Sequence, residues 1–109
     1  MVENKQYIVV FVTAKDISQA RKIAQDLLEE KLIACANIMD GVQSFFWWKG
    51  KINESSEVML ALKTRRDLFD RIVSRVRSLH SYDTPEVIAL PIVDGSPDYL
   101  KWIDSSVRF

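Results

Sequence analysis

The order in which two hydrophobic patterns alternate limits the fold of this chain more than any other feature. A continuous apolar run at residues 7–13 precedes apolar residues spaced three and four apart at 17–28. The run is typical of a strand covered on both faces, and the spacing is typical of an amphipathic helix. After a long strand pair at 33–63, a second helical stripe follows at 68–79 and another apolar run at 87–92. The order β-α-β-β-α-β predicts an α/β fold of the α+β kind, with both helices on one face of a four-stranded antiparallel sheet.

The strand pair in the middle of the chain is unusually long. Asp40 and Gly41 favour a bend or bulge in its first arm. Lys49 and Gly50 favour a tight turn, because glycine accepts a positive φ without steric cost. Strands usually run about 5 to 6 residues, whereas each arm here has about a dozen. We therefore expect the far end of this hairpin to project beyond its own domain.

Four consecutive aromatic residues, Phe45, Phe46, Trp47 and Trp48, lie at that far end. Successive strand residues point to opposite faces, so neither face of the tip would be dry in a single chain. Exposed apolar patches mark protein contact sites, and long edge strands leave backbone groups unpaired. We expect pairing with further copies of the chain, with Phe46, Trp47 and Trp48 in the interface. The alternative is that the C-terminal helix of the same chain covers the cluster.

Polar residues predict where the helices begin. Asp16 and Gln19 resemble a capping box at the start of the first helix. Thr64 is placed to be the N-cap of the second helix. Ser96 and Pro97 favour the start of a short C-terminal helix, because a capping hydroxyl precedes a proline at the first helical position.

Length and charge bound the class of protein. Residues 1–109 are enough for one domain and too few for two. The 15 basic residues balance 15 acidic ones, whereas a nucleic-acid or anionic-membrane partner would favour a basic excess. No apolar run approaches the ~20 residues of a membrane span, and the first residues lack the pattern of a signal peptide. We expect a cytoplasmic protein with no nucleic-acid or membrane partner.

Candidate chemistry depends on one cysteine, Cys35, and one histidine, His80. A Cys–His nucleophilic pair is conceivable. However, a cysteine in an apolar strand usually packs as a small hydrophobic residue, and a histidine at a helix C-terminus interacts well with the helix dipole. A closed zinc site needs four ligands, usually cysteine and histidine, and one chain offers one of each together with carboxylates such as Asp83 and Glu86. We therefore expect at most a weaker metal site at a subunit boundary, for which copper is the natural ion. With three glycines in total, the chain has no GxGxxG loop or P-loop for phosphate binding. Since Cys35 and His80 are also better explained by packing and by the helix end, we expect no enzyme.

The sequence resembles the CutA family of divalent-cation tolerance proteins along nearly its whole length. The matching segments, in family order, are LIACANI at 32–38, FWWKGKI at 46–52, EV at 57–58, KT at 63–64, LHSYDTPE at 79–86, ALPI at 89–92 and YLKWI at 99–103. Two features depart from the family pattern. Ser81 replaces a proline that usually follows the histidine, and residues 13–16 lack a cysteine or proline that usually follows the first strand.

The resemblance implies a ferredoxin-like subunit and a tight homotrimer formed by sheet-edge pairing, similar to the PII signalling proteins. It also implies a link to copper tolerance, and it places the family cysteine at Cys35 and the family histidine at His80. Our leading hypothesis is a trimeric binding or signalling module that holds copper(II) weakly, with no organic cofactor. The residues proposed for the metal are His80, Cys35, Glu86 and Asp83, in a cleft between subunits that also contains Tyr82 and Lys63.

Two further hypotheses stay open at this point. The first is a structural interaction protein that anchors or regulates an unknown protein partner, with metal binding incidental. The second is an enzyme that uses Cys35 and His80. A metal stoichiometry that survives dialysis would favour the leading hypothesis over the structural one.

Overall fold

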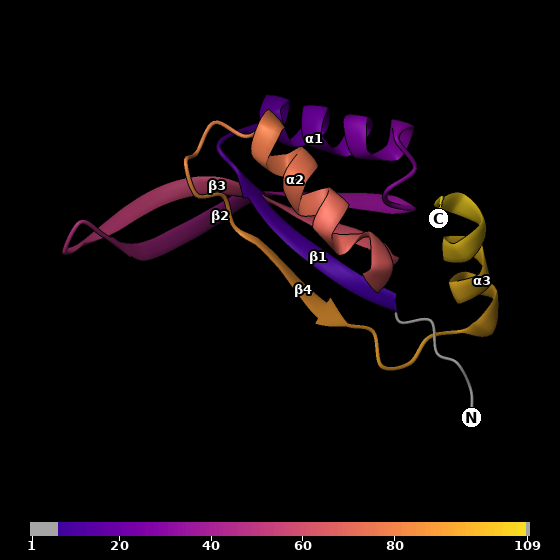
Figure 1. The fold of residues 1–109 in the computed structure, drawn as a ribbon. Helices are drawn as coiled ribbons and strands as arrows, with labels where there is room; N and C mark the ends of the chain where they lie inside the picture. The colour runs from indigo at the N-terminus through magenta and orange to yellow at the C-terminus, as the bar shows by residue number, and fades with distance from the viewer. Residues whose placement is uncertain (1–6, 109) are drawn as a thin grey trace.

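The computed structural model describes residues 7–108, which form a four-stranded antiparallel sheet and three helices. In chain order the elements are β1 (Tyr7–Ala14), α1 (Ile17–Glu29), β2 (Cys35–Trp48), β3 (Lys51–Arg65), a 3-10 turn η1 (Arg66–Leu68), α2 (Phe69–Leu79), β4 (Val87–Pro91) and α3 (Pro97–Ser106). The strand order is β2-β3-β1-β4, and every neighbouring pair is antiparallel. Figure 1 shows α1 and α2 on the same face of the sheet. The predicted α+β fold is therefore confirmed.

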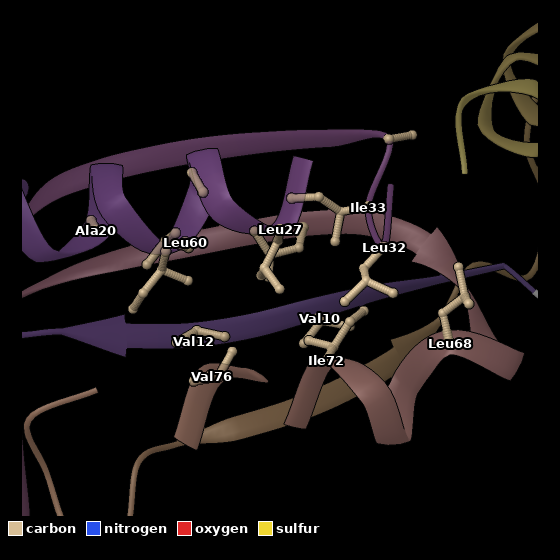
Figure 2. Packing of buried hydrophobic residues seen from close by; sticks show 14 of the residues in the cluster. Val10, Val12, Ala20, Leu27, Leu32, Ile33, Leu60, Leu68, Ile72 and Val76 are labelled. Carbon is tan, nitrogen blue, oxygen red and sulfur yellow. The ribbon is translucent and has the colours of Figure 1, made fainter. Parts of the chain in front are cut away.

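The core lies between the sheet and these two helices. Val10 and Val12 of β1 alternate with outward-facing residues, which gives the strand one buried face. Leu27 of α1 and Ile72 of α2 point at that face, and both are fully buried (Figure 2). α3 adds Ile103 to the same cluster. Burial of these side chains is the main force that holds the helices on the sheet.

β2 and β3 form a ribbon that extends well past the helices, as Figure 1 shows. Its pairing shifts by a bulge between Met39 and Val42, where Gly41 has a φ of +76°. At the tip Lys49 and Gly50 both have positive φ, as a type I′ turn requires. The predicted bulge, turn and projecting end are all present.

The C-terminal helix does not cover the aromatic tip. α3 packs at the opposite end of the sheet from the tip (Figure 1). Phe45 and Trp47 are 66% and 72% exposed, so the alternative of cover within the chain is wrong. Ile103 explains the position of α3, because its burial in the main core fixes the helix there.

One of the predicted helix starts was also wrong. Asp16 caps α1 as predicted, since its carboxylate accepts a hydrogen bond of 2.8 Å from the Gln19 backbone N–H. Thr64, however, lies inside β3 and is fully buried. Its hydroxyl donates to the Leu32 carbonyl at 2.6 Å, which ties β3 to the segment between α1 and β2. The strand therefore continues two residues past its predicted end at residue 63, and α2 begins only after a 3-10 turn.

The sheet face away from α1 and α2 carries apolar residues in cross-strand rows. One row contains Ala61, Phe11 and Ile88, which are register partners on three strands. Ile88 and Leu90 of the edge strand β4 are each 51% exposed. An apolar face beside an exposed edge strand is a surface suited to contact with another chain.

Candidate functional site

A hollow of about 770 Å³ lies between the β2–β3 ribbon and the loop that leads into β4. The ribbon contributes aromatic side chains, among them Phe46 and Trp48, and the carboxylate of Glu57. The loop contributes Tyr82 and a second acidic group, Glu86. The hollow therefore joins residues from distant parts of the sequence and combines apolar walls with negative charge.

Two carboxylates influence each other in this hollow. Burial, followed by the negative charge of Glu57, raises the pKa of Glu86 above its usual value. The Tyr82 hydroxyl donates to Glu57 Oε2 at 3.0 Å. Burial, followed by that hydrogen bond, raises the pKa of Tyr82. Like-charged, partly desolvated carboxylates favour a cation, because a cation relieves both their repulsion and their lost hydration.

His80 fixes the loop beside the hollow. Its Nε2 lies 2.6 Å from the Thr13 carbonyl oxygen, and its Nδ1 accepts from the Tyr82 backbone N–H at 3.1 Å. Since Nδ1 accepts, Nε2 must carry the proton that is donated to Thr13. The imidazole also packs on the Tyr82 ring, with centroids 4.5 Å apart. Neither nitrogen has a lone pair available for a metal unless one of these hydrogen bonds opens.

Ser81, which the sequence offers in place of a proline, has a partner of its own. The Gln19 side-chain amide donates to its hydroxyl at 3.0 Å. This bond ties the start of the loop to the first turn of α1. The loop is thus held by hydrogen bonds from two side chains, His80 and Gln19, rather than by the rigid ring of a proline at position 81.

Cys35 lies at the other end of the sheet. It pairs with Lys63 in the ribbon, and Lys63 Nζ lies 3.9 Å from its sulfur and also contacts Asn37 Oδ1. Burial, followed by the influence of the neighbouring Cys35 side chain, raises the pKa of Tyr99. His80 instead contacts Thr13, the register partner of Met59, and Lys63 lies four positions further along β3 than Met59. At ~3.3 Å per residue, the two predicted ligands are separated by about 13 Å along the strand.

The structure thus divides the predicted site residues into two groups. Tyr82, Asp83 and Glu86 line the hollow, and His80 lies directly behind Tyr82. Cys35 and Lys63 form a separate cluster with Asn37. Across residues 7–108, no three His, Cys, Asp or Glu side chains come close enough together to hold a metal ion. A single chain therefore offers pairs of ligands rather than a closed set.

The aromatic residues of the tip and Glu57 of β3 differ in how they relate to the hollow and in how far the sequence predicted them. Phe46 and Trp48 line the hollow, whereas Trp47, the partner of Ile52, is the most exposed of the tip aromatics. Our sequence reasoning did not assign a role to Glu57. The available signals were a charged residue inside a predicted strand and the family match at 57–58, and its position opposite Tyr82 and Glu86 depends on the register of the ribbon.

The family model described as "CutA1 divalent ion tolerance protein" matches residues 8–106. Among curated proteins, "Protein CutA 1, chloroplastic" of Oryza sativa is 44% identical over 101 residues, which is 93% of this chain and 57% of the relative. "Divalent-cation tolerance protein CutA" of Pyrococcus horikoshii is 45% identical over 96 residues, or 88% of this chain and 93% of the relative. The chain thus spans little more than half of the plant relative and almost all of the archaeal one.

Solved structures agree with this fold. The crystal structure of CutA1 from Oryza sativa superposes with a TM-score of 0.92 at 43% identity and covers 94% of both chains. The periplasmic divalent cation tolerance protein CutA from Archaeoglobus fulgidus has a TM-score of 0.91 at 41% identity, covering 94% of this chain and 99% of that one. The names of these relatives place one in the chloroplast and one in the periplasm. The cytoplasmic location expected for this chain stays a prediction. No helix within residues 7–108 is long and apolar enough to cross a membrane.

Proposed function

The chain belongs to the CutA1 divalent ion tolerance protein family, and from this premise we propose that it is a self-assembling module that binds a divalent cation weakly in the hollow between the ribbon and the β4 loop. One observation supports this proposal above the others. Glu57 and Glu86 share the hollow, and the charge of Glu57 contributes to the raised pKa of Glu86. A divalent cation would neutralise both groups at once.

The donor set favours oxygen ligands and modest affinity. Two carboxylates, with the Tyr82 hydroxyl and water, suit a hydrated divalent ion held without a rigid cage. Copper(II) is the first ion to test, because it leads the affinity order of the divalent first-row metals. His80 would join such a site only by giving up its bond to Tyr82 N–H or to Thr13. Cys35 would join only if another copy brought it there.

Assembly is the second part of the proposal. The tip exposes Trp47 and Phe45, and the uncovered sheet face exposes Ile88 and Leu90 next to an edge strand. These surfaces support a homotrimer in which the sheets of neighbouring copies pair. Such an assembly would place the hollow, which the ribbon partly encloses, at a boundary between subunits.

The rival function is a structural interaction protein whose assembly anchors or regulates a protein partner. The exposed aromatic tip is the observation that favours it. The two functions differ in whether the cation site is specific. A cation that binds with fixed stoichiometry through named carboxylates supports the first, whereas binding that ignores those carboxylates leaves the rival. Catalysis is not part of either proposal.

The test is a calorimetric titration of copper(II) into the purified protein and five variants, with magnesium as a second ion. Glu57→Gln and Glu86→Gln each remove one charge but keep the side-chain shape. We expect each to weaken binding about tenfold or more, because charge-assisted contacts are worth about 1.5–3 kcal/mol. Glu54→Gln is the matched control, since Glu54 lies on the same strand but does not line the hollow.

The remaining pair of variants tests the predicted soft ligands. His80→Ala and Cys35→Ala should change copper binding less than the carboxylate variants do. Binding should also weaken on acidification, as Glu86 takes up a proton at its raised pKa. Parent-like affinity in both Glu57→Gln and Glu86→Gln would sink the proposed site.

A further inference from the structure

A second hollow, of about 300 Å³, lies in the helix layer and plays no part in the cation proposal. It forms where the end of α1, the middle of α2 and the segment after α3 meet. Figure 1 shows that the end of α3 lies near the end of α1, and the Arg108 backbone N–H donates to the Lys31 carbonyl at 2.9 Å. Its lining consists of Glu30, Leu32, Arg71, Ser74, Arg75 and Arg108. Three guanidinium groups therefore surround one small space in a chain of zero net charge.

Arg75 is already neutralised by its own neighbours. Its guanidinium pairs with Glu30 through Nε and with Asp26 at 3.6 Å. A third contact runs from Arg75 Nη1 to the Ser78 hydroxyl at 2.9 Å. These contacts fix Arg75 at one side of the hollow and also cancel the negative charge of Glu30. Among the described lining residues, the one carboxylate is thus already paired.

Arg71 and Arg108 differ from Arg75 in this respect. Neither forms an ion pair with any acidic side chain within residues 7–108. Their backbones are nevertheless well placed, because Arg71 lies within α2 and Arg108 is tied to Lys31 next to the buried Val107. Among the described residues the hollow therefore has two guanidinium groups without an acidic partner, and Ser74 contributes to the same lining.

We propose that this hollow binds a phosphate group, held by Arg71 and Arg108 with the Ser74 hydroxyl as a further donor. Guanidinium groups donate two parallel hydrogen bonds to phosphate oxygens, and a serine hydroxyl adds one more. The volume lies at the low end for ligand pockets, which fits inorganic phosphate or a small phosphomonoester rather than a nucleotide. The hollow faces away from both the aromatic tip and the open sheet face, so assembly through those surfaces leaves it accessible.

The experiment is a titration of the full chain with inorganic phosphate and, separately, with glycerol 3-phosphate, at constant ionic strength set by chloride. Amide and guanidinium NMR signals of Arg71, Ser74 and Arg108 report the site. Arg71→Gln and Arg108→Gln should each weaken binding about tenfold or more. Arg77→Gln is the matched control, because Arg77 lies in the same helix but outside the lining.

Glu30→Gln provides a test with the opposite sign. This variant removes a negative charge from the lining and takes away one of the carboxylates that neutralise Arg75, so phosphate should bind more tightly. In the parent protein the two ligands are compared with each other. If glycerol 3-phosphate binds more tightly than inorganic phosphate, the site is assigned to a phosphorylated small molecule; if inorganic phosphate binds more tightly, it is assigned to the free ion. The proposal is overturned if phosphate at millimolar concentration gives no saturable shift in the parent. It is also overturned if Arg77→Gln weakens binding as much as Arg71→Gln, since the effect would then be general charge.

Discussion

The two ends of the β2–β3 ribbon differ in what covers them. At the end beneath the helices, Leu60 and Leu62 have no exposed surface, whereas at the tip Trp47 is 72% exposed. Both ends belong to one continuous antiparallel pair, interrupted by a single bulge. Backbone pairing can therefore carry a ribbon beyond its core, but it cannot bury the side chains that the ribbon carries. Packing within this chain explains the covered end, whereas for the exposed tip we propose cover by further copies.

The largest effect should come from equal truncations at the two ends of β3. Leu60→Ala leaves a cavity beneath the helices and should cost about 2–5 kcal/mol of unfolding free energy. Ile52→Ala removes a side chain that is 65% exposed, so within one chain it should cost less than ~0.5 kcal/mol. Any larger loss at Ile52 should depend on protein concentration, because it then comes from contacts between copies. Urea denaturation at two concentrations measures both, and an equal, concentration-independent loss would erase the distinction.

A smaller effect should follow from the buried hydroxyl of the covered end. Thr64→Val keeps the shape but leaves the Leu32 carbonyl without its donor. We expect a loss of about 1–3 kcal/mol, because an unsatisfied buried acceptor carries its desolvation penalty. Thr64→Ser retains the hydroxyl and should recover most of the hydrogen-bond contribution. Thermal denaturation compares the three proteins, and a harmless Thr64→Val would show that this bond does not tie β3 to the preceding segment.

Between the two ends, Glu86 should make stability depend on pH. Its pKa is raised in the folded chain, so the folded state holds the proton more tightly than the unfolded state does. Stability should therefore fall as pH rises from the ordinary glutamate pKa of about 4.3 through the raised value, and should stay lower above it. Glu86→Gln removes this dependence, so the variant should gain on the parent as the pH rises. Melting temperatures across that range measure the difference, with Glu54→Gln as the control; a gap that does not change with pH would contradict the account.

The smallest effect should occur at the turn of the tip. Lys49 is a non-glycine residue with a φ of +53°, which asparagine tolerates better than lysine does. Lys49→Asn should stabilise the turn by about 0.5 kcal/mol. Hydrogen exchange of the amides near Lys51 should slow accordingly. Faster exchange in the variant would mean that the contact of Lys49 with the Trp48 ring matters more than the backbone conformation.

The sequence predicted the fold because its signals are local. The apolar runs of β1 and β4 and the stripes of α1 and α2 each occupy one short segment, and their order leaves few topologies. Thr64 shows where this reasoning ends. A hydroxyl before a helical stripe reads as a cap, but its partner, Leu32, lies 32 residues away and is brought close only by tertiary packing.

The site was less predictable because its parts meet only after folding. Cys35 and His80 were predicted as ligands from their chemical types, but the register of β3 places them about 13 Å apart along the strand. Glu57 lay in a family-matching segment without an assigned role, and its approach to Tyr82 depends on both the ribbon and the loop that His80 anchors. Residue type can indicate a candidate ligand, whereas the strand register determines which candidate ligands lie close together.

The mass of the assembled protein in solution tests the central claim most directly, namely that the tip is complemented by further copies. Light scattering on the parent at low micromolar concentration should give three times the 12.6 kDa mass of the chain. Trp47→Asp should shift the mass towards that of one chain, because an uncompensated charge buried against apolar neighbours costs at least several kcal/mol. A parent protein with the mass of a single chain at that concentration would contradict the account.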